Sequence, residues 1–408
     1  MGEWRATTWG EEVSLEYGKA IRGYQDAVAL YRVYGANGPI GFTDMPLAPG
    51  PGVILGRKGA YRSVHYSPEP FFVIDTAYYV RPKSPDLIMR WLYYAIIHHK
   101  LGEIDDGSPI PSTTRAAVYV RDLEAPPIKE QEAIASVLGS LDDKIELNRR
   151  MNKTLEAMAR AIFKDWFVDF GPTRAKTEGR APYLAPEIWD LFPDAFNEEG
   201  MPGGWELSEI GKEVEAVGGA TPSTKEPSYW ERGDHHWATP KDLSRLTSLV
   251  LLDTDRKITD AGAKKISSGL LPVGTVLLSS RAPIGYLAIA GVPTAVNQGF
   301  IAMVCKKRLP NVFVLFWCYE NLDYIKGISG GSTFAEISKK AFRSVPVVMP
   351  SEQALIAYEG LIRPLYDRIV ANIKESASLA QTRDLLLPKL MSGEIRLREA
   401  ENAVEAVA

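Results

Sequence analysis

The sequence predicts an α+β protein built as an internal repeat, in which two similar mixed α/β domains are each followed by one long helix. Three observations predict this fold. A short motif near the N-terminus occurs again past the midpoint, each half contains a long heptad pattern, and short β-rich runs fill the remainder. The chain has 408 residues, too many for one ordinary core, and its 45% hydrophobic and 24% charged residues are typical of a globular protein.

The repeat can be read directly from matching strings. The short motif is Trp4-x5-Gly10-x-Glu12-Val13 in the first half and Trp205-x5-Gly211-x-Glu213-Val214 in the second. Each half then has an apolar stretch that passes through glycine and a basic residue, GVILGRKGAYRSVHY at 52–66 and GTVLLSSRAPIGYLAIA at 274–290. Each half ends with a Pro-rich turn and Glu-Gln-x-x-Ile, which opens the heptad pattern.

The heptad patterns predict two long helices with seams of apolar residues spaced alternately four and three apart. The first seam is Ile134, Leu138, Leu141, Ile145, Asn148, Asn152, Leu155, Ala159, Ile162 and Trp166. The second is shifted by 224 and contains Leu365, Ile369, Asn372, Ser376, Leu379, Arg383, Leu386 and Leu390.

Both seams become polar at matching positions, Asn148/Asn152 and Asn372/Ser376. Because buried polar residues fix the register of paired helices, the two helices are expected to pair with each other over about 36 residues, or roughly 54 Å. The alternative is two unrelated amphipathic helices, which the shared polar positions disfavour. Pro364 and Pro388 are expected to kink or shorten the second helix.

The predicted domain boundaries follow from these helices. Short β-rich runs lie at Val53–Leu55, Phe71–Val80, Thr275–Ser279 and Phe300–Val304, with helices around Leu87–Lys100 and Asn311–Tyr324. Residues 171–203 are rich in Pro, Gly and charge, which indicates a linker. The order is a first domain at 1–127, a long helix at 128–170, the linker at 171–203, a second domain at 204–349, a second long helix at 350–397 and a tail at 398–408.

Composition excludes several classes. Neither a membrane span nor a secretory signal is visible, so we expect a cytoplasmic protein without membrane contact. Two cysteines without a Cys/His cluster, and histidines in adjacent pairs, predict no metal site. The net charge of −4 is unusual for a free-standing DNA binder. Residues 204–349 carry 17 basic against 14 acidic side chains, so DNA binding would rely on local patches or on a partner.

No known catalytic constellation is present. The sequence has no GxxxxGK[ST], GxGxxG before a helix, GxSxG or HExxH, and no Asn-Pro-Pro-aromatic tetrapeptide of amino-group DNA methyltransferases. We therefore expect neither catalytic residues nor a cofactor. The Gly-rich stretch Gly330–Thr333 can hold a phosphate with backbone N–H groups or can form a plain turn.

With the repeat established, the sequence resembles the specificity subunits of type I restriction-modification systems over nearly its whole length. The strings that carry the resemblance are YGANGPIG (34–41), GPGVILGRKGAYRSVHY (50–66), FFVIDTAYYV (71–80), MPGGWELSEIG (201–211), SSRAPIGYLAIA (279–290), AVNQGFIAMV (295–304), the 126–167 helix segment and LLLPKLMSGEIRL (385–397). Together these strings are highly specific, although any one alone is weak.

The resemblance implies two target-recognition domains that each read one half of a split site in double-stranded DNA. It also implies that the two helices form an antiparallel coiled coil, and that two methyltransferase subunits and a restriction-translocase subunit dock on the chain. The methyl donor and the cleavage chemistry would belong to those partners. Such a pseudo-two-fold protein can present two readers to half-sites about one helical turn, ~34 Å, apart.

In the first domain the candidate DNA contacts lie in the glycine-flanked loop after an apolar strand. They are Arg57, Lys58, Tyr61 and Arg62, and the alternative is a solvated charged turn. A second set, Ser112, Thr113, Thr114 and Arg115, is suited to phosphate contacts.

In the second domain the candidates are spread over several loops. They are Trp237, Thr239, Lys241, Ser279, Ser280, Arg281, Asn297, Gln298, Ser332, Thr333, Lys339 and Lys340. For Asn297 and Gln298 we favour a role in holding the fold, because they belong to the scaffold string NQGF. Lys339 and Lys340 fit either a phosphate track or a solvated face.

The aromatic residues Phe163, Trp166, Phe167 and Phe170 are candidates for partner docking or for packing on the second helix, and for Trp166 we favour packing. Two other classes of function are weighed against DNA recognition. A coiled-coil scaffold whose domains bind protein predicts no sequence-dependent DNA binding. An enzyme with an unrecognised site is disfavoured by the missing motifs.

Overall fold

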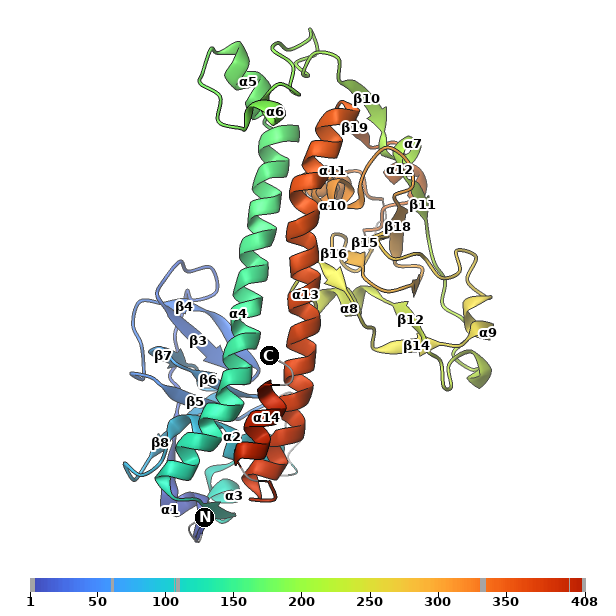
Figure 1. Ribbon diagram of the computed structural model, residues 1–408. Coiled ribbons are helices and arrows are strands. Elements are labelled where there is room, and N and C mark those ends of the chain that lie inside the picture. Colours follow the sequence, from blue (N-terminus) through green and yellow to red (C-terminus); the bar gives the residue numbers. More distant parts are fainter. Residues whose placement is uncertain are drawn as a thin grey trace. The chain divides into compact units, whose positions relative to one another are not determined.

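The computed structural model describes residues 4–59, 62–105, 107, 111–330, 335–395 and 397–405. The chain divides into two compact units, one of residues 1–147 with 375–408 and the other of residues 148–374. Each unit holds one mixed α/β domain together with one part of each long helix, α4 (Ile128–Phe167) and α13 (Glu352–Met391) (Figure 1).

The first unit is built on an antiparallel sheet of strand order β2-β8-β5-β6 and a second sheet of order β4-β3-β7, in which β3 and β7 are parallel. Strands β1 and β9 form a separate antiparallel pair. The strands are β1 (Arg5–Thr8), β2 (Val13–Tyr17), β3 (Tyr31–Gly35), β4 (Gly38–Thr43), β5 (Gly52–Gly56), β6 (Val64–Ser67), β7 (Phe71–Val73), β8 (Ala77–Pro82) and β9 (Asp122–Ala125). The helices beside α4 and α13 are α1 (Trp9–Glu12), α2 (Met89–His98), η1 (Leu101–Glu103), α3 (Arg115–Tyr119) and α14 (Leu397–Glu405).

The second unit repeats this plan. Its larger sheet has the order β11-β18-β15-β16-β13, its smaller sheet has the order β14-β12-β17 with β12 and β17 parallel, and β10 pairs with β19. The strands are β10 (Glu206–Glu209), β11 (Glu215–Val217), β12 (His235–Ala238), β13 (Val250–Leu251), β14 (Arg256–Ile258), β15 (Val276–Ser279), β16 (Leu287–Ala290), β17 (Thr294–Val296), β18 (Phe300–Val304) and β19 (Pro346–Met349). The short helices are α5 (Gly171–Thr177), α6 (Pro186–Trp189), α7 (Ile210–Glu213), η2 (Pro227–Tyr229), α8 (Pro240–Ser244), α9 (Asp260–Ala263), α10 (Asn311–Glu320), α11 (Leu322–Gly327) and α12 (Lys339–Arg343). The predicted α+β repeat is therefore confirmed.

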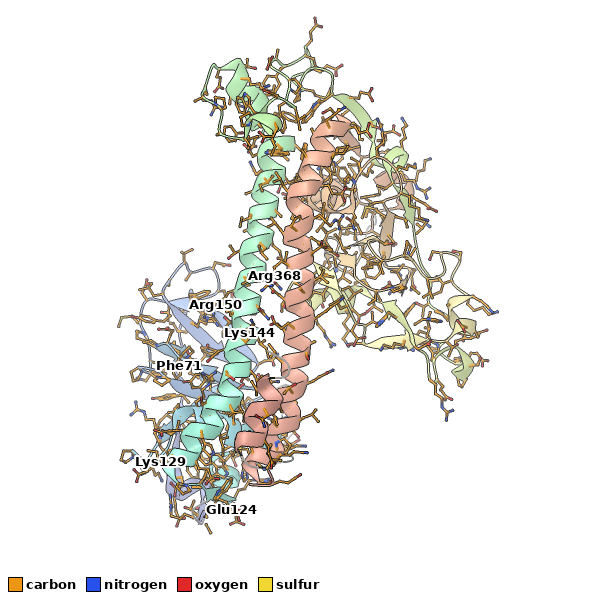
Figure 2. The ribbon with its side chains drawn as sticks, in the orientation of Figure 1. Phe71, Glu124, Lys129, Lys144, Arg150 and Arg368 are labelled. Carbon is orange, nitrogen blue, oxygen red and sulfur yellow. The ribbon has the colours of Figure 1, made fainter. Side chains whose placement is uncertain are left out.

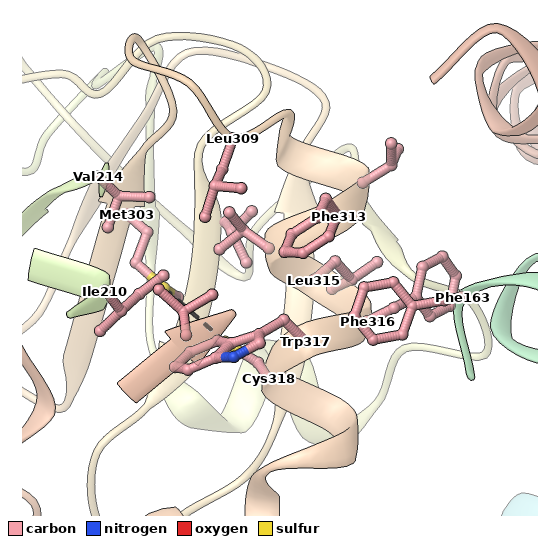
Figure 3. Packing of buried hydrophobic residues seen from close by; sticks show 14 of the residues in the cluster. Phe163, Ile210, Val214, Met303, Leu309, Phe313, Leu315, Phe316, Trp317 and Cys318 are labelled. Carbon is pink, nitrogen blue, oxygen red and sulfur yellow. Dashed lines mark hydrogen bonds between the residues drawn. The ribbon is translucent and has the colours of Figure 1, made fainter. Parts of the chain in front are cut away.

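One helix covers the larger sheet in each domain. In the first, α2 buries Trp91, Leu92 and Tyr94 in the cluster that includes Val53 and Leu55 of β5. In the second, α10 is buried along residues 312–318, and Phe313 and Phe316 contact Phe163 of α4 (Figure 3). A helix that is apolar all round must be enclosed, so α10 lies between its sheet and the long helices.

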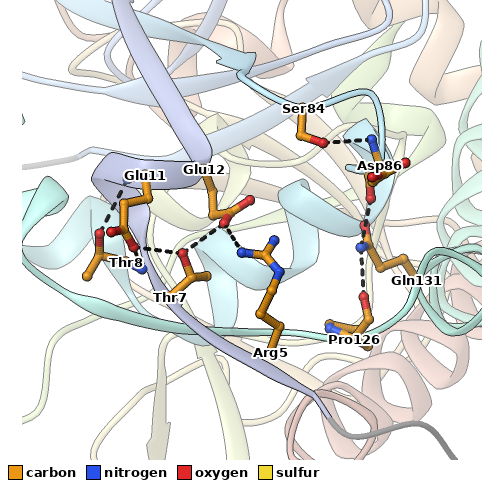
Figure 4. A network of polar contacts seen from close by, with 9 residues as sticks. All are labelled: Arg5, Thr7, Thr8, Glu11, Glu12, Ser84, Asp86, Pro126 and Gln131. Carbon is orange, nitrogen blue, oxygen red and sulfur yellow. Dashed lines mark hydrogen bonds and ion pairs between the residues drawn. The ribbon is translucent and has the colours of Figure 1, made fainter.

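The repeated short motif has a structural cause in both halves. A Cβ at Gly10 would lie 2.8 Å from Tyr119 Cβ, and one at Gly211 would lie 2.6 Å from Arg343 Cβ, so only glycine fits. The glutamate two residues later is buried and bound by polar side chains. Glu12 accepts from Arg5 at 2.6 Å and from Thr7 at 2.8 Å (Figure 4).

Its counterpart Glu213 accepts from Arg308 at 2.6 Å and from Ser208 at 2.7 Å. In both cases the hydrogen bond from arginine is the main cause that lowers the carboxyl pKa. The tryptophan-glycine-glutamate motif thus marks the entry of each domain, where the first strand, a one-turn helix and the last short helix meet.

The long helices lie side by side and run in opposite directions in each unit (Figure 1). In the first unit Lys144 Nζ of α4 (labelled in Figure 2) is 3.3 Å from Glu375 Oε1 of α13. In the second unit Asn372 Nδ2 donates to Asn152 Oδ1 at 2.8 Å, and the rings of Phe167 and Tyr358 are 5.0 Å apart. Every predicted seam position is buried or half-buried, as expected from the heptad spacing.

The expected effect of the two prolines is wrong in one respect, because α13 is not shortened at either position. Pro364 and Pro388 both lie on the exposed face of the helix. The carbonyls that they leave without a helical partner belong to Gly360 and Asp384, which are exposed too, so water can bind them. Burial of the seam on the opposite face holds the helix together.

Two segments expected to be irregular are partly helical. The predicted linker 171–203 contains α5 and α6, and Phe192 packs edge-on against Trp166 with ring centroids 5.0 Å apart. The predicted tail 398–408 falls largely in α14, whose Ala400 is fully buried in the core of the first unit. In both cases a few small or aromatic residues attach a polar segment to an existing core.

Glu156 is a half-buried ionisable residue of the second unit. It lies on α4, and its Oε1 accepts a hydrogen bond from the backbone N–H of Leu249 at 3.1 Å. Burial raises the pKa of Glu156 to about 7, against small opposing effects of the Leu249 bond and of Lys153. The folded chain therefore binds this proton more tightly than the unfolded chain does.

Replacement of the motif glycines tests the packing at the domain entries. Gly10→Ala and Gly211→Ala are each expected to lower the free energy of unfolding by about 1–3 kcal/mol, because the new Cβ overpacks a closed contact. Urea unfolding followed by circular dichroism measures this. Gly360→Ala is the matched control, since nothing lies within 4 Å of that position on the exposed side of α13, and it is expected to gain up to about 1 kcal/mol. Unchanged stability of both motif variants would contradict the packing argument.

Glu156→Gln tests the buried carboxyl. A folded-state pKa raised from 4.5 to about 7 makes stability fall as pH rises through that window. The glutamine keeps an acceptor for Leu249, so the variant is expected to be more stable than wild type at pH 8, by at most about 3 kcal/mol, and equal near pH 4.5. Urea unfolding at both pH values measures the difference, with the exposed Glu132→Gln on the same helix as control. A parallel pH dependence in variant and wild type would refute the assignment.

Candidate nucleic-acid interface

Two predicted segments of the first domain lie against each other. The turn that follows β5 pairs with the loop that leads into α3, because Thr113 N donates to Arg57 O at 2.9 Å and Gly59 N donates to Pro111 O at 3.0 Å. Lys58 forms a single β-bridge with Ser112 and has an exposed side chain. The structure therefore brings Arg57, Lys58 and the loop that ends in Arg115 to one place.

An exposed tyrosine joins the two arginines of this loop pair. Tyr17, the last residue of β2, is 46% exposed. The Cζ atoms of Arg57 and Arg115 lie 4.8 and 4.1 Å from its ring centroid. Tyr17 also packs on Tyr78 at 5.1 Å, and burial raises the pKa of Tyr78 to about 12. The sequence candidates did not include Tyr17, because its role depends on three segments that only the fold brings together.

Other first-domain candidates serve the fold. Arg62 donates from Nε, Nη1 and Nη2 to the carbonyls of Gly102, Gly59 and Ile104 at 3.0, 2.9 and 3.0 Å. Thr113 is buried, and Thr114 caps the N-terminus of α3 by accepting from Ala117 N. Tyr61 lies outside the described residues.

The second domain repeats the loop pair. Ile337 N donates to Ser280 O at 3.0 Å. The backbone of Arg281 forms a single β-bridge with Glu336, as that of Lys58 does with Ser112. Arg281 therefore occupies the position of Lys58. Ser338 caps α12 by accepting from Ala341 N at 3.1 Å, as Thr114 caps α3, so Lys339 occupies the position of Arg115. Lys339 and Lys340 are exposed.

Several second-domain candidates are corrected by burial. Trp237 is 3% exposed and donates its indole N–H to Ala220 O, so solvent and DNA do not reach it. Ser279 is fully buried and binds the backbone of the following turn, and Ser280 is 3% exposed. Thr239 forms a capping box with Asp242 at the start of α8. These positions are scaffold in this conformation.

The remaining second-domain candidates lie at or near the surface. Asn297 Oδ1 accepts from Gly299 N at 2.8 Å, which fits the favoured scaffold role, whereas exposed Gln298 accepts from Thr221 at 2.7 Å. Lys241 is exposed near Asp255. Arg281 Nη1 lies 3.6 Å from Glu336 Oε2. Ser332 and Thr333 lie outside the described residues.

The aromatic residues considered for docking are mostly internal. Phe163, Trp166 and Phe167 are buried in the core of the second unit, where Trp166 and Phe167 contact Tyr358 of α13. The preferred packing role of Trp166 is confirmed, and docking through these three rings is excluded in this conformation. Phe170 is half-buried and packs on Trp205.

The structure therefore consists of two domains of the same plan, each with a matching loop pair, joined to a pair of long helices. The chain belongs to the family described as the type I restriction modification DNA specificity domain, whose model matches residues 24–157 and 202–359. The resemblance inferred from the sequence is thereby confirmed.

Individual relatives agree with this assignment. The chain is 37% identical over 185 residues to the type I restriction enzyme MjaIX specificity subunit of Methanocaldococcus jannaschii, a match that covers 44% of this chain and 42% of the relative. It is 23% identical to the HindI specificity subunit of Haemophilus influenzae, over 79% of this chain and 81% of the relative. The chain thus matches less than half of the first relative and about four fifths of the second.

A solved structure shares the fold. The S subunit of a type I restriction-modification system from M. genitalium superposes with a TM-score of 0.57 at 15% identity, covering 95% of this chain and 96% of that chain. Among the described residues, no helix has both the length and the apolar character that a membrane crossing needs.

Proposed function

We propose that this chain is the subunit that selects the DNA target of a type I restriction-modification complex, with each domain contacting one half of a split site. The observation that carries the proposal is the repeated loop pair, which presents Lys58 and Arg115 in one domain and Arg281 and Lys339 at the same positions in the other. Cations on exposed loops bind phosphates and base edges. The domains differ in sequence at these loops, so the two half-sites need not match.

The long helices would act as a coiled-coil spacer between the two recognition domains. Helices α4 and α13 have 40 residues each, or about 60 Å at 1.5 Å per residue. This length is sufficient for half-sites separated by about one turn of DNA, ~34 Å. The buried Asn148, Asn152 and Asn372 would hold the register on which a constant spacing depends.

The proposal includes partners and no catalysis by this chain. Two methyltransferase subunits and a restriction-translocase subunit would dock on it in the cytoplasm and supply the methyl donor and the cleavage chemistry. The net charge of −4 supports this arrangement, because partners would then contribute much of the phosphate neutralisation. The candidate DNA contacts that lie at or near the surface and have no fold-holding role assigned above include Arg57, Lys58, Arg115, Lys241, Arg281, Gln298, Lys339 and Lys340.

Methylation mapping tests the function. The chain is co-expressed with the methyltransferase and restriction genes adjacent to its own, and methylated bases are mapped genome-wide with and without it. We expect a split motif with a fixed spacer that disappears without the chain. Exchange of residues 1–127 for those of another family member is expected to change one half of the motif only. Unchanged methylation in an assembled, active complex would refute the proposal and favour a protein-binding scaffold.

Single substitutions at equivalent positions test the shared loop position. Lys58→Ala and Arg281→Ala are each expected to weaken DNA binding by the assembled complex and to reduce the salt dependence by about one phosphate contact. Titration of the complex with its target duplex at several salt concentrations measures both. Lys129→Ala is the control, because Lys129 is exposed at the start of α4 and is not part of the loop pair. A salt slope identical to wild type in both variants would show that these cations do not contact DNA.

A further inference from the structure

The two domains differ most clearly at the tyrosine that holds Arg57 and Arg115. Strand pairing places Tyr17 opposite Tyr78 in the first domain. In the second domain the same register, continued one residue beyond Val217↔Ala302, places Gly218 at the position of Tyr17. The position of Arg57 is taken by Ser280, whose carbonyl accepts from Ile337 as that of Arg57 accepts from Thr113. At these equivalent positions, the stack of two guanidinium groups on one ring is present in the first domain and not in the second.

The glycine in the second domain confirms the correspondence. A Cβ at Gly218 would lie 3.1 Å from Lys339 Nζ. The ammonium group of Lys339 therefore lies beside the position that the Tyr17 side chain occupies in the first domain. A lysine is a point charge on a flexible stem, whereas arginine is a planar fork of donors. At the positions of Tyr17, Arg57 and Arg115, the first domain thus carries two guanidinium groups on one ring, and the second carries one lysine ammonium.

Arg57 and Arg115 are less engaged by carboxylates than Arg5 and Arg90 of the same domain, so more of their N–H donors are left without a protein acceptor in the described part of the chain. Arg5 and Arg90 are bound to carboxylates at 2.6 and 2.7 Å. Arg57 donates from Nη1 to the carbonyl of Asp75 at 3.0 Å, and Arg115 Nη2 is 3.9 Å from Glu16 Oε2. Arg115 Nε is enclosed and has no hydrogen-bond partner among the described residues. Contact with the ring of Tyr17 restrains both guanidinium groups and, apart from the enclosed Nε of Arg115, leaves donors for a ligand.

We propose that Arg57 and Arg115, oriented by Tyr17, read a guanine in the half-site bound by the first domain. This inference rests on the proposed function and specifies it. Guanine presents two acceptors, N7 and O6, at its major-groove edge, and a guanidinium held in a fixed plane matches them with two donors. Lysine at the same position keeps the charge but loses the paired geometry. The second domain, with Gly218 and Ser280, lacks this device, so the guanine contact that this device makes belongs to the first half-site.

The test uses the full chain in its complex and reads each motif position separately. Arg57→Lys and Arg115→Lys are expected to relax one guanine of the first half-site in the methylation map and to leave the second half-site unchanged. In binding assays, 7-deazaguanine at that position removes N7 and is expected to weaken the wild-type complex by about 5- to 150-fold. The same base change is expected to have little further effect on the arginine variant that has already lost the contact.

Controls separate this role from folding and from simple charge. Arg81→Lys is the matched control, because its guanidinium lies 5.4 Å over the ring of Tyr79 in the same sheet, outside the loop pair. Arg81→Lys is expected to leave the methylated DNA motif unchanged. Tyr17→Leu removes the ring but neither arginine, and is expected to relax the same guanine. Thermal unfolding of each variant is measured alongside.

The possible outcomes are distinct. If the arginine variants bind all DNA sequences more weakly to the same extent, with a shallower salt dependence, the arginines contact phosphates and the guanine assignment is overturned. An unchanged motif in the double variant Arg57→Lys/Arg115→Lys, while removal of the chain still abolishes methylation, would overturn the inference and leave the proposed function standing. If any variant unfolds, the 7-deazaguanine series on the wild-type complex still decides, since insensitivity at every guanine of the first half-site contradicts it.

Discussion

The buried amides between the long helices are the constraint on which the rest of the chain depends. Asn372 Nδ2 donates to Asn152, and Asn148 Nδ2 reaches the carbonyl of Asn372 at 3.5 Å. A slip along the seam would place these amides against leucine or isoleucine, and each buried polar group without a partner costs about 1–3 kcal/mol. One register is therefore selected. Because Asn148 and Asn372 are related by the 224-residue shift, the point where they meet is a local pseudo-two-fold centre of the helix pair.

The two ends of the helix pair attach their domains by different chemistry. In the first unit Asp142 accepts from Arg383 at 2.6 Å and from Tyr94 of α2 at 2.7 Å, so one carboxylate joins α4, α13 and the domain. At the matching place in the second unit, the seam position of Arg383 is taken by Ala159, which lies in an apolar cluster with Phe163 and Tyr358. Polar bonds thus hold the first domain at this point, and aromatic packing holds the second at the matching point. The two units share the same arrangement of secondary structure, but the side chains that join domain and helices differ between them.

The sequence predicted well whatever depends on local periodicity. The seams follow from spacing alone, and every seam residue from Ile134 to Leu390 is buried or half-buried as expected. The shortening expected at Pro364 does not occur, because its cost depends on which face of the helix carries the freed carbonyl, and that face is set by tertiary packing. The sequence did not predict which polar residues are buried. Ser279 is a plausible surface residue by type, yet it is fully buried and binds the backbone of its own turn.

The candidate DNA contacts also show that the sequence does not predict which distant residues the fold brings together. Arg57 and Arg115 were found separately, as basic residues in two loops, but nothing in the linear sequence relates either of them to Tyr17. Strand pairing and the loop pair bring the three together, and the same arrangement in the second domain brings together Ser280, Lys339 and Gly218. The sheet is thus built in the same way in the two domains, whereas the residues that it carries to the loop surface differ. A duplicated fold of this kind holds two surfaces in equivalent frames while allowing each to recognise a different chemical pattern.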